Sequence, residues 1–505
     1  MNKRTEERNP WLWIPTLYFT QGIPYVMVMS VSVMMYKNLE VSNTDIAFFT
    51  SLLYFPWFLK FAWGPFIDMF KTKRFWTFTM QLLVGIALFG IALSLPTSIY
   101  WKLSLIVFAL MAFASATHDI AADGFYMLSL KEQQQAAFVG VRSTFYRVAT
   151  IVGSGGLVVI AGDLASTMGV KGAWSVVFLI TGTLFVLLFL YHKFILPFPK
   201  EDKGTLNNKK LSGTQIGLLA GGFILFAGFV YLSFLVLGFI LALFKVVSPW
   251  NIIVSTILLV VIFIILFKTF VAAFVDKFEQ SENKNEALLP FIEFLKAFVI
   301  FMQKKDIWNI LGFLLFFRFA EAQLVKLVQP FLLDPRIKGG LGLSTSEVGI
   351  VYGTIGIISL MAGGLIGGYV ISKKGLRWWL WPMVIIMHTP DLAFVYLSHF
   401  QPTNFVLINI AVAAEQFGYG FGFTAYLMFM IMVSQGEHKT AHYAICTGIM
   451  ALGMMLPGMY SGALQEQIGY SSFFEWVIIS TIPGFIVAGL VKIDPLFGKK
   501  KNTSA

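Results

Sequence analysis

Long apolar runs alternate with short polar breaks along most of the 505-residue chain. A bilayer-spanning helix needs about 20 consecutive apolar residues, and runs of this length predict an all-α polytopic membrane protein with about 14 transmembrane helices. The expected spans lie near 11–36, 46–67, 75–95, 102–130, 138–161 and 173–196, then 212–244 and 250–275, and finally 307–332, 347–371, 378–397, 404–433, 440–464 and 473–492. The polar linker from Asp276 to Asp306 contains an apolar part, 288–302, that predicts an interfacial amphipathic helix.

The composition agrees with a membrane protein. Hydrophobic residues make up 57% of the chain and charged residues 12%, whereas a soluble domain carries about 25% charged residues. The net charge of +11 lies largely in alternate loops, as expected for loops kept in the cytoplasm, so we expect cytoplasmic termini and no nucleic-acid binding. The apolar run from Trp11 has no small-residue cleavage site and predicts a first span rather than a signal peptide. With Cys446 as its single cysteine, the chain has no disulfide framework.

The two groups of six spans share short motifs. Residues 41–45 (VSNTD) and 343–347 (LSTSE) each place a helix-capping hydroxyl three residues before an acid, and Trp76 and Trp378 are separated by the same offset. Parallel six-helix halves joined by a cytoplasmic linker are the organisation of major facilitator transporters. The expected segments are an N-terminal half at 1–200, an inserted hairpin with linker at 201–306, and a C-terminal half at 307–505.

The loop after the second span reads Gly64-Pro-Phe-Ile-Asp68-Met-Phe-Lys71-Thr-Lys73-Arg74. It resembles the loop motif of the facilitator superfamily, in which a Gly and an Asp precede basic residues. One interpretation is a latch, in which Asp68 and the basic group Lys71, Lys73 and Arg74 bridge neighbouring helix ends. The alternative is a topology anchor whose basic side chains reach lipid headgroups.

Charged residues within the fourth and fifth spans predict a functional site. Each such charge costs about 2.5–3.5 kcal/mol at a helix centre. Helical rise places Asp123 and Arg142 about 12 and 8 Å from the cytoplasmic end, and Asp119 and Arg147 about 18 and 15 Å. We therefore expect two ion pairs, Asp123–Arg142 and Asp119–Arg147. They either hold the helices together or form a site in which an aspartate exchanges protons while an arginine attracts an anion, and Asp119, which is deeper and next to His118, is the preferred proton carrier.

The second half carries its own intramembrane charges. Arg318 and Glu321 are three residues apart and form either an intrahelical pair or part of the substrate site. Lys326 and Glu415 lie at similar depth, so we expect them to pair, with Gln416 as a neighbouring polar candidate.

Two proline-containing stretches also lie within spans. His388 and Asp391 flank Pro390, where the freed backbone carbonyl predicts a kink. Gln21 precedes a Gly-Ile-Pro sequence, where it serves either substrate hydrogen bonding or ordinary helix packing.

The residues at 118–123, His-Asp-Ile-Ala-Ala-Asp, resemble the Gln-Asp-Ile-Ala-x-Asp signature shared by AmpG-type muropeptide permeases and the acetyl-coenzyme A transporter family. Tyr146-Arg147 followed by Gly155-Gly156, and Glu415 followed by the glycine-rich run at 418–422, are similar to AmpG helices of the two halves. The resemblance covers nearly the whole chain; His118 in place of Gln and the long linker are departures.

This resemblance implies a proton-coupled secondary transporter of the bacterial inner membrane. It would import anhydromuropeptides, GlcNAc-anhydroMurNAc with or without peptide, through a cavity lined by the first and fourth helices of each half. The alternatives are transport of acetyl-CoA or another organic anion or sugar, and a non-transporting membrane sensor or assembly partner. We expect no enzyme activity, cofactor or metal, and a monomer in the lipid bilayer. The proton-coupling candidates are Asp119, Asp123 and His118, and the substrate-binding candidates are Arg142, Tyr146, Arg147, Arg318, Glu321, Lys326, Glu415, Gln416 and Gln21.

Overall fold

The computed structural model describes residues 8–69, 71–200, 202, 269, 273, 275–276, 289–436 and 438–499. The regular structure of these residues is entirely helical, and eight of the helical stretches are long and apolar enough to cross a membrane. The expected all-α polytopic fold is therefore confirmed. The inserted hairpin lies almost wholly outside the described residues, so the total of fourteen spans and the three segment boundaries stay predictions.

The helices begin and end close to the expected spans. The first part comprises η1 (Pro10–Leu12), α1 (Ile14–Val26), η2 (Met27–Val31), α2 (Ser32–Asn38), α3 (Asn43–Leu52), α4 (Phe55–Met69), α5 (Lys73–Ser94), α6 (Tyr100–Ser129), α7 (Glu132–Ile151), η3 (Val152–Leu157) and α8 (Val158–Ile195). The later part comprises α11 (Leu289–Met302), α12 (Ile307–Phe316), α13 (Phe319–Leu333), η5 (Arg336–Lys338), α14 (Thr345–Val348), η6 (Gly349–Gly356), α15 (Ile357–Lys374), α16 (Leu376–His388), η7 (Thr389–Asp391), α17 (Leu392–Phe400), α18 (Phe405–Val433), α19 (Lys439–Ile479) and α20 (Ile482–Leu490).

Two helices are longer than one bilayer crossing and contain a turning point at glycine. Gly169 in α8 and Gly469 in α19 have φ of 74° and 78°, a region that side chains with a Cβ rarely adopt. Each turn falls between two expected spans, at 161–173 and 464–473. The helices on either side are therefore separate crossings, and the turns recur 300 residues apart.

The expected helix starts and the proline kink are also present. The Ser42 hydroxyl accepts from the Asp45 backbone N–H at 3.0 Å, and Ser344 and Glu347 form a reciprocal capping box. Helix α16 ends at His388, and the one-turn 3₁₀ helix η7 carries the chain past Pro390 into α17. These local features follow from side chains that lie within a few residues of one another.

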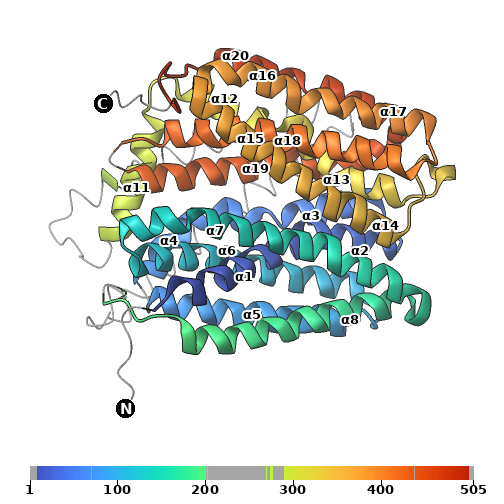
Figure 1. Cartoon of the computed structure of the whole chain (residues 1–505), viewed down its shortest axis with the longest axis horizontal. Coiled ribbons are helices and arrows are strands. Elements are labelled where there is room, and N and C mark those ends of the chain that lie inside the picture. The colour runs from blue at the N-terminus through green and yellow to red at the C-terminus, as the bar shows by residue number, and fades with distance from the viewer. Residues whose placement is uncertain are drawn as a thin grey trace.

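The helices form two layers. Figure 1 shows the blue-to-green helices α1–α8 in one layer and the orange-to-red helices of the later part in the other, with α11 at one end between them. Helix α11, at the place expected for an amphipathic helix, contacts α4 of the first layer and α19 of the second. Its Phe301 is fully buried and lies 5.4 Å from the His442 ring.

The layers meet closely at the end that carries the α2–α3 and α13–α14 connections. A Cβ added to Gly353 in η6 would lie 1.9 Å from the carbonyl oxygen of Ser154 in η3, so the two backbones are in direct contact. Polar bonds cross the same boundary: Lys37 lies 2.7 Å from Asp334, and Asn43 donates to Gln465 at 2.6 Å. Backbone contact and buried polar bonds together seal this end.

Candidate functional site

The ion pair expected between α6 and α7 is present. Arg142 Nη2 lies 2.9 Å from Asp123 Oδ1. The Tyr18 hydroxyl of α1 donates to the same oxygen at 3.3 Å, and the Arg142 guanidinium lies over the Tyr18 ring, 4.6 Å from its centroid. The side chains of Asp123 and Arg142 are 39% and 32% exposed, so solutes can reach the pair.

The second expected pair, Asp119–Arg147, is wrong. Asp119 Oδ2 accepts from the Trp57 indole N–H at 3.0 Å, and Arg147 forms no ion pair within the described part of the chain. The physical reason is rotation around α7. Residues five apart on a helix are turned by about 140°, so Arg142 and Arg147 cannot both face α6.

His118 faces away from Asp119, into a buried polar network. The His118 Nε2 atom lies 3.0 Å from the Gln81 Nε2 atom, and His192 Nδ1 lies 2.8 Å from the Gln81 Oε1 atom. The other ring nitrogen of His192 contacts the Thr16 hydroxyl at 2.9 Å. This network joins α1, α5, α6 and α8 behind the site.

Gln21 and Tyr146 both lie near Asp119. Helices α1 and α7 touch at Gly22, where a Cβ would lie 2.8 Å from the Tyr146 carbonyl oxygen. The Gln21 side chain lies within polar interaction range of Asp119. Tyr146 lies within electrostatic range of Asp119 and of Tyr25 in α1. Close approach of the two helices therefore brings both candidates to the same place.

Arg318 occupies a break in its span. It lies between α12 and α13 with φ −107° and ψ 20°, which are not α-helical values. Its guanidinium donates to the Tyr419 hydroxyl of α18 and lies over the Phe423 ring, 4.6 Å from the centroid. No ion pair with Glu321 is present among the described residues, so the intrahelical pair does not form.

The expected pair Lys326–Glu415 is also wrong. The Lys326 Nζ atom donates to the Thr50 hydroxyl at 3.0 Å, which joins α13 to α3 of the other layer. Glu415 Oε2 instead accepts from Gln416 Nε2 at 2.9 Å. Matching depth placed Lys326 and Glu415 at one level, but the direction in which each helix turns its side chains decides which groups meet.

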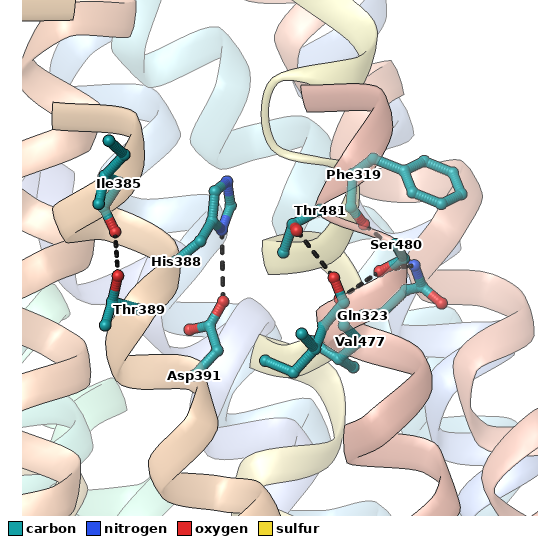
Figure 2. A network of polar contacts seen from close by, with 10 residues as sticks. Phe319, Gln323, Ile385, His388, Thr389, Asp391, Val477, Ser480 and Thr481 are labelled. Carbon is teal, nitrogen blue, oxygen red and sulfur yellow. Dashed lines mark hydrogen bonds and ion pairs between the residues drawn. The ribbon is translucent and has the colours of Figure 1, made fainter. Parts of the chain in front are cut away.

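Glu415 has other acids as neighbours. Carboxylate oxygens of Glu321, Asp391 and Glu415, from α13, η7 and α18, lie within 4.8 Å of one another, and all three side chains are buried. Asp391 Oδ2 also lies 3.3 Å from His388 Nδ1. Figure 2 shows this pair on the kinked α16–η7 segment, apart from the polar network around Gln323. We call Glu321, Asp391 and Glu415 the triacid cluster.

The two layers face each other across a group of tyrosines and arginines. Tyr25 of α1 lies within electrostatic range of Asp119, Arg147 and Arg318. Tyr419 of α18 lies within range of Tyr25, Arg147 and Arg318. Candidates from both layers thus converge, and the two guanidiniums can receive an anionic solute between α1, α7, α13 and α18.

The basic loop motif joins helix ends within the first layer. Arg74 Nε donates to the Leu196 carbonyl oxygen at 3.1 Å, beyond the end of α8. The Asp202 carboxylate accepts from the backbone N–H groups of Lys73 at 2.6 Å and Arg74 at 2.9 Å. These contacts fix the start of α5 against the end of α8.

The latch interpretation of this motif stays a prediction. The Asp68 side chain lies outside the described residues, and Lys71 is exposed with φ of 62°.

Comparison with known proteins places this geometry in a family. The model of the Major Facilitator Superfamily matches residues 16–317, more than half of the chain. The chain belongs to the major facilitator superfamily.

Relatives and solved structures agree with that family. The Rickettsia conorii protein named "Putative transporter AmpG 4" is 21% identical over 485 residues, covering 93% of this chain and 94% of its own, and a Rickettsia felis protein of the same name is 22% identical over 481 residues, covering 93% and 94%. The crystal structure of the nucleoside transporter NupG matches with a TM-score of 0.59 at 14% identity, covering 96% of this chain and 100% of that one. A POT family transporter in complex with 5-aminolevulinic acid matches with a TM-score of 0.59 at 12% identity, covering 94% and 95%. These likenesses confirm the AmpG resemblance and the transporter fold.

Several residues of this major facilitator transporter's site were missed from the sequence. Tyr18, Trp57 and Tyr419 contact the candidate charges, but 16% of the chain is aromatic, so aromatic residues alone mark no position. Tyr419 lies four residues after Glu415 and therefore on the same face of its helix. This spacing was the signal that could have identified Tyr419 from the sequence.

Proposed function

We propose that this major facilitator transporter imports anhydromuropeptides, GlcNAc-anhydroMurNAc with or without peptide, by proton-coupled alternating access. The observation that carries the proposal is the convergence of Arg147 and Arg318, from opposite layers, on Tyr25 and Tyr419. Neither arginine forms an ion pair among the described residues, so both guanidiniums can bind a carboxylate of the solute. Guanidiniums bind carboxylates in a bidentate geometry, which suits the lactyl or peptide carboxylates of such a substrate.

The aromatic residues around the arginines suit the sugar part. Tyr25 packs edge-on against Trp57 with centroids 5.3 Å apart, and Tyr419 lies 5.7 Å from Phe423. Flat apolar rings next to hydrogen-bonding hydroxyl and indole groups match the mixed faces of a sugar ring.

Proton exchange is assigned to Asp119. Protonating Asp123 would break its ion pair with Arg142, whereas Asp119 accepts a hydrogen bond from the neutral Trp57 indole and has Lys60 within electrostatic range but forms no ion pair among the described residues. A proton can therefore reach Asp119 without the loss of an ion pair. His118, held by Gln81, supports the position of α6 behind this aspartate.

The end that carries the α2–α3 and α13–α14 connections is closed, and its side of the membrane relates the structure to a step of the transport cycle. Positive loop charge predicts that the sealed α2–α3 and α13–α14 end faces the periplasm. In this proposal the structure is a state closed on the outer side, and outward opening requires Lys37–Asp334 and Lys326–Thr50 to separate. Alternating access is completed when the layers rock about the site between them.

The test is uptake into proteoliposomes that contain the full chain, with labelled GlcNAc-anhydroMurNAc and an acidic exterior. We expect accumulation that collapses with a protonophore. Arg147→Gln and Arg318→Gln should each raise KM by about 10- to 100-fold, since a hydrogen bond to a charged group contributes about 1.5–3 kcal/mol. Arg377→Gln, an exposed arginine at the start of α16, serves as the matched control. Failure of this glycan alongside uptake of acetyl-CoA would overturn the substrate assignment.

A further inference from the structure

The triacid cluster lies where charge is expensive. Glu321 is 0% exposed, and Asp391 and Glu415 are each 1% exposed. Removing one carboxylate from water costs several kcal/mol unless a cation compensates it. Three carboxylates that converge from three helical elements are therefore stabilised only by protons or by a bound cation.

The carboxylates present unpartnered oxygens to one another. Both Glu321 oxygens, Asp391 Oδ1 and Glu415 Oε1 are buried without a hydrogen-bond partner. The remaining oxygens of Asp391 and Glu415 are held by His388 and Gln416. Each of these two acids thus uses one oxygen for a protein contact that orients it and keeps the other for a ligand, as the second-shell contacts of metal ligands do.

We propose that Glu321, Asp391 and Glu415 form a binding site for a hard, oxygen-preferring cation of the size of Na⁺ or Ca²⁺. Carboxylate oxygens around one Ca²⁺ lie about 2.3–2.6 Å from it, and hence at most about 5 Å from each other. The ligand oxygens of the cluster lie within 4.8 Å of one another, so one ion can contact all three residues. Glu321, Asp391 and Glu415 each offer one oxygen within this distance.

The neighbouring cationic side chain does not fill this role. Arg318, one turn before Glu321, directs its guanidinium to Tyr419 and Phe423. Its Nε is itself buried without a partner. Soft or nitrogen-preferring metals are disfavoured, because the cluster offers three carboxylates and its one nearby imidazole, His388, turns Nδ1 to Asp391.

The site lies beside the proposed substrate site. Arg318 and Glu321 are within electrostatic range, and Tyr352 lies within range of Glu321, Glu415 and Tyr419. A cation at the cluster would neutralise the negative charge of Glu321 next to Arg318, and that charge would otherwise repel an anionic solute. Cation and anion binding should then be positively coupled. The cation site itself does not rest on the proposed substrate.

The test uses the purified full chain without any transported solute. Binding of ²²Na⁺ and of ⁴⁵Ca²⁺ is measured separately, with choline chloride keeping the ionic strength constant. We expect saturable binding of one of the two ions, which identifies the one that the site prefers, and a higher unfolding temperature in its presence. Saturable binding of neither ion, as for a cluster that holds only protons, would overturn the proposal.

Variants locate the bound ion. Glu321→Gln should weaken binding at least about tenfold, because one negative charge and one carboxylate ligand are lost. Glu475→Gln, an exposed glutamate of α19, is the control and should bind as the original chain does. Asp391→Asn is a second variant in case Glu321→Gln fails to fold, as judged by gel filtration. Undiminished binding in a folded cluster variant would place the ion elsewhere and overturn the assignment. If the original chain binds the ion but takes up no glycan, that result would count against the proposed function and not against the cation site.

Discussion

The Nζ atom of Lys37 lies 2.7 Å from Oδ2 of Asp334, which joins the end of α2 to the end of α13 across the two layers. Tyr470 donates to the same Asp334 oxygen at 2.6 Å, and Asn43 accepts from Lys37 at 2.8 Å. The pair is therefore the centre of a polar cluster that seals one end of the transporter. In a protein that works by alternating access, such a cluster must form and break in each cycle.

Removing this pair should favour the outward-facing state. Lys37→Ala leaves Asp334 with one fewer donor and should shift the equilibrium toward opening by about tenfold, or about 1.4 kcal/mol. The measurement is labelling of Ser30→Cys, placed behind the seal where Ser30 contacts Gln329, by a membrane-impermeant maleimide in a Cys446→Ser background. Lys338→Ala, an exposed lysine near the same end, should not change the rate. Equal labelling in Lys37→Ala and the parent would show that the pair does not hold the seal.

Gly353 should be intolerant of any side chain. An alanine Cβ would overlap the Ser154 carbonyl oxygen, at 1.9 Å, and keep η3 and η6 apart. We expect Gly353→Ala to lose uptake, and purified protein to unfold at lower temperature. Gly368→Ala in α15 is the matched control, because its Cβ would meet nothing within 4 Å and alanine favours a helix by about 1 kcal/mol. Normal uptake in Gly353→Ala would show that this backbone contact is dispensable.

The Asp123–Arg142 pair should show coupling in a double-mutant cycle. Asp123→Asn and Arg142→Gln each leave one charge without its partner, so each should lower the stability of the original chain. The same substitution should lower stability less when the partner charge has already been removed. Unfolding temperatures of the four proteins in one detergent measure this coupling. Strict additivity would mean that the 2.9 Å contact contributes nothing to stability.

Asp119→Asn should abolish proton coupling and leave downhill transport of the solute intact. The amide can keep a hydrogen bond to Trp57 but cannot exchange a proton, so accumulation driven by a pH gradient should be abolished while downhill exchange continues. Both activities are measured in the same proteoliposomes, with Glu475→Gln as control. Persistent pH-driven accumulation in the variant would transfer the proton role to another group.

Features set by neighbours in the chain were predictable from the sequence. The span boundaries follow apolar run length, the caps at Ser42 and Ser344 follow from residues three positions apart, and the kink follows Pro390. The Asp123–Arg142 contact was also predictable, because two adjacent antiparallel helices bring residues of matching depth together.

Partners that depend on helix rotation or on long-range packing were not predictable. Depth places Asp119 and Lys326 at a level in the membrane, but their partners Trp57 and Thr50 come from helices whose orientation no local pattern encodes. The triacid cluster left no spacing signature, because its members are 70 and 24 residues apart along the chain and converge only when α13, η7 and α18 pack. The sequence by itself thus determined which segments cross the membrane and which charges they carry, since the free energy of inserting a segment into the bilayer depends on the residues of that segment. The tertiary structure alone decided which of those charges meet, since that depends on how each helix turns about its axis and on how the two layers close.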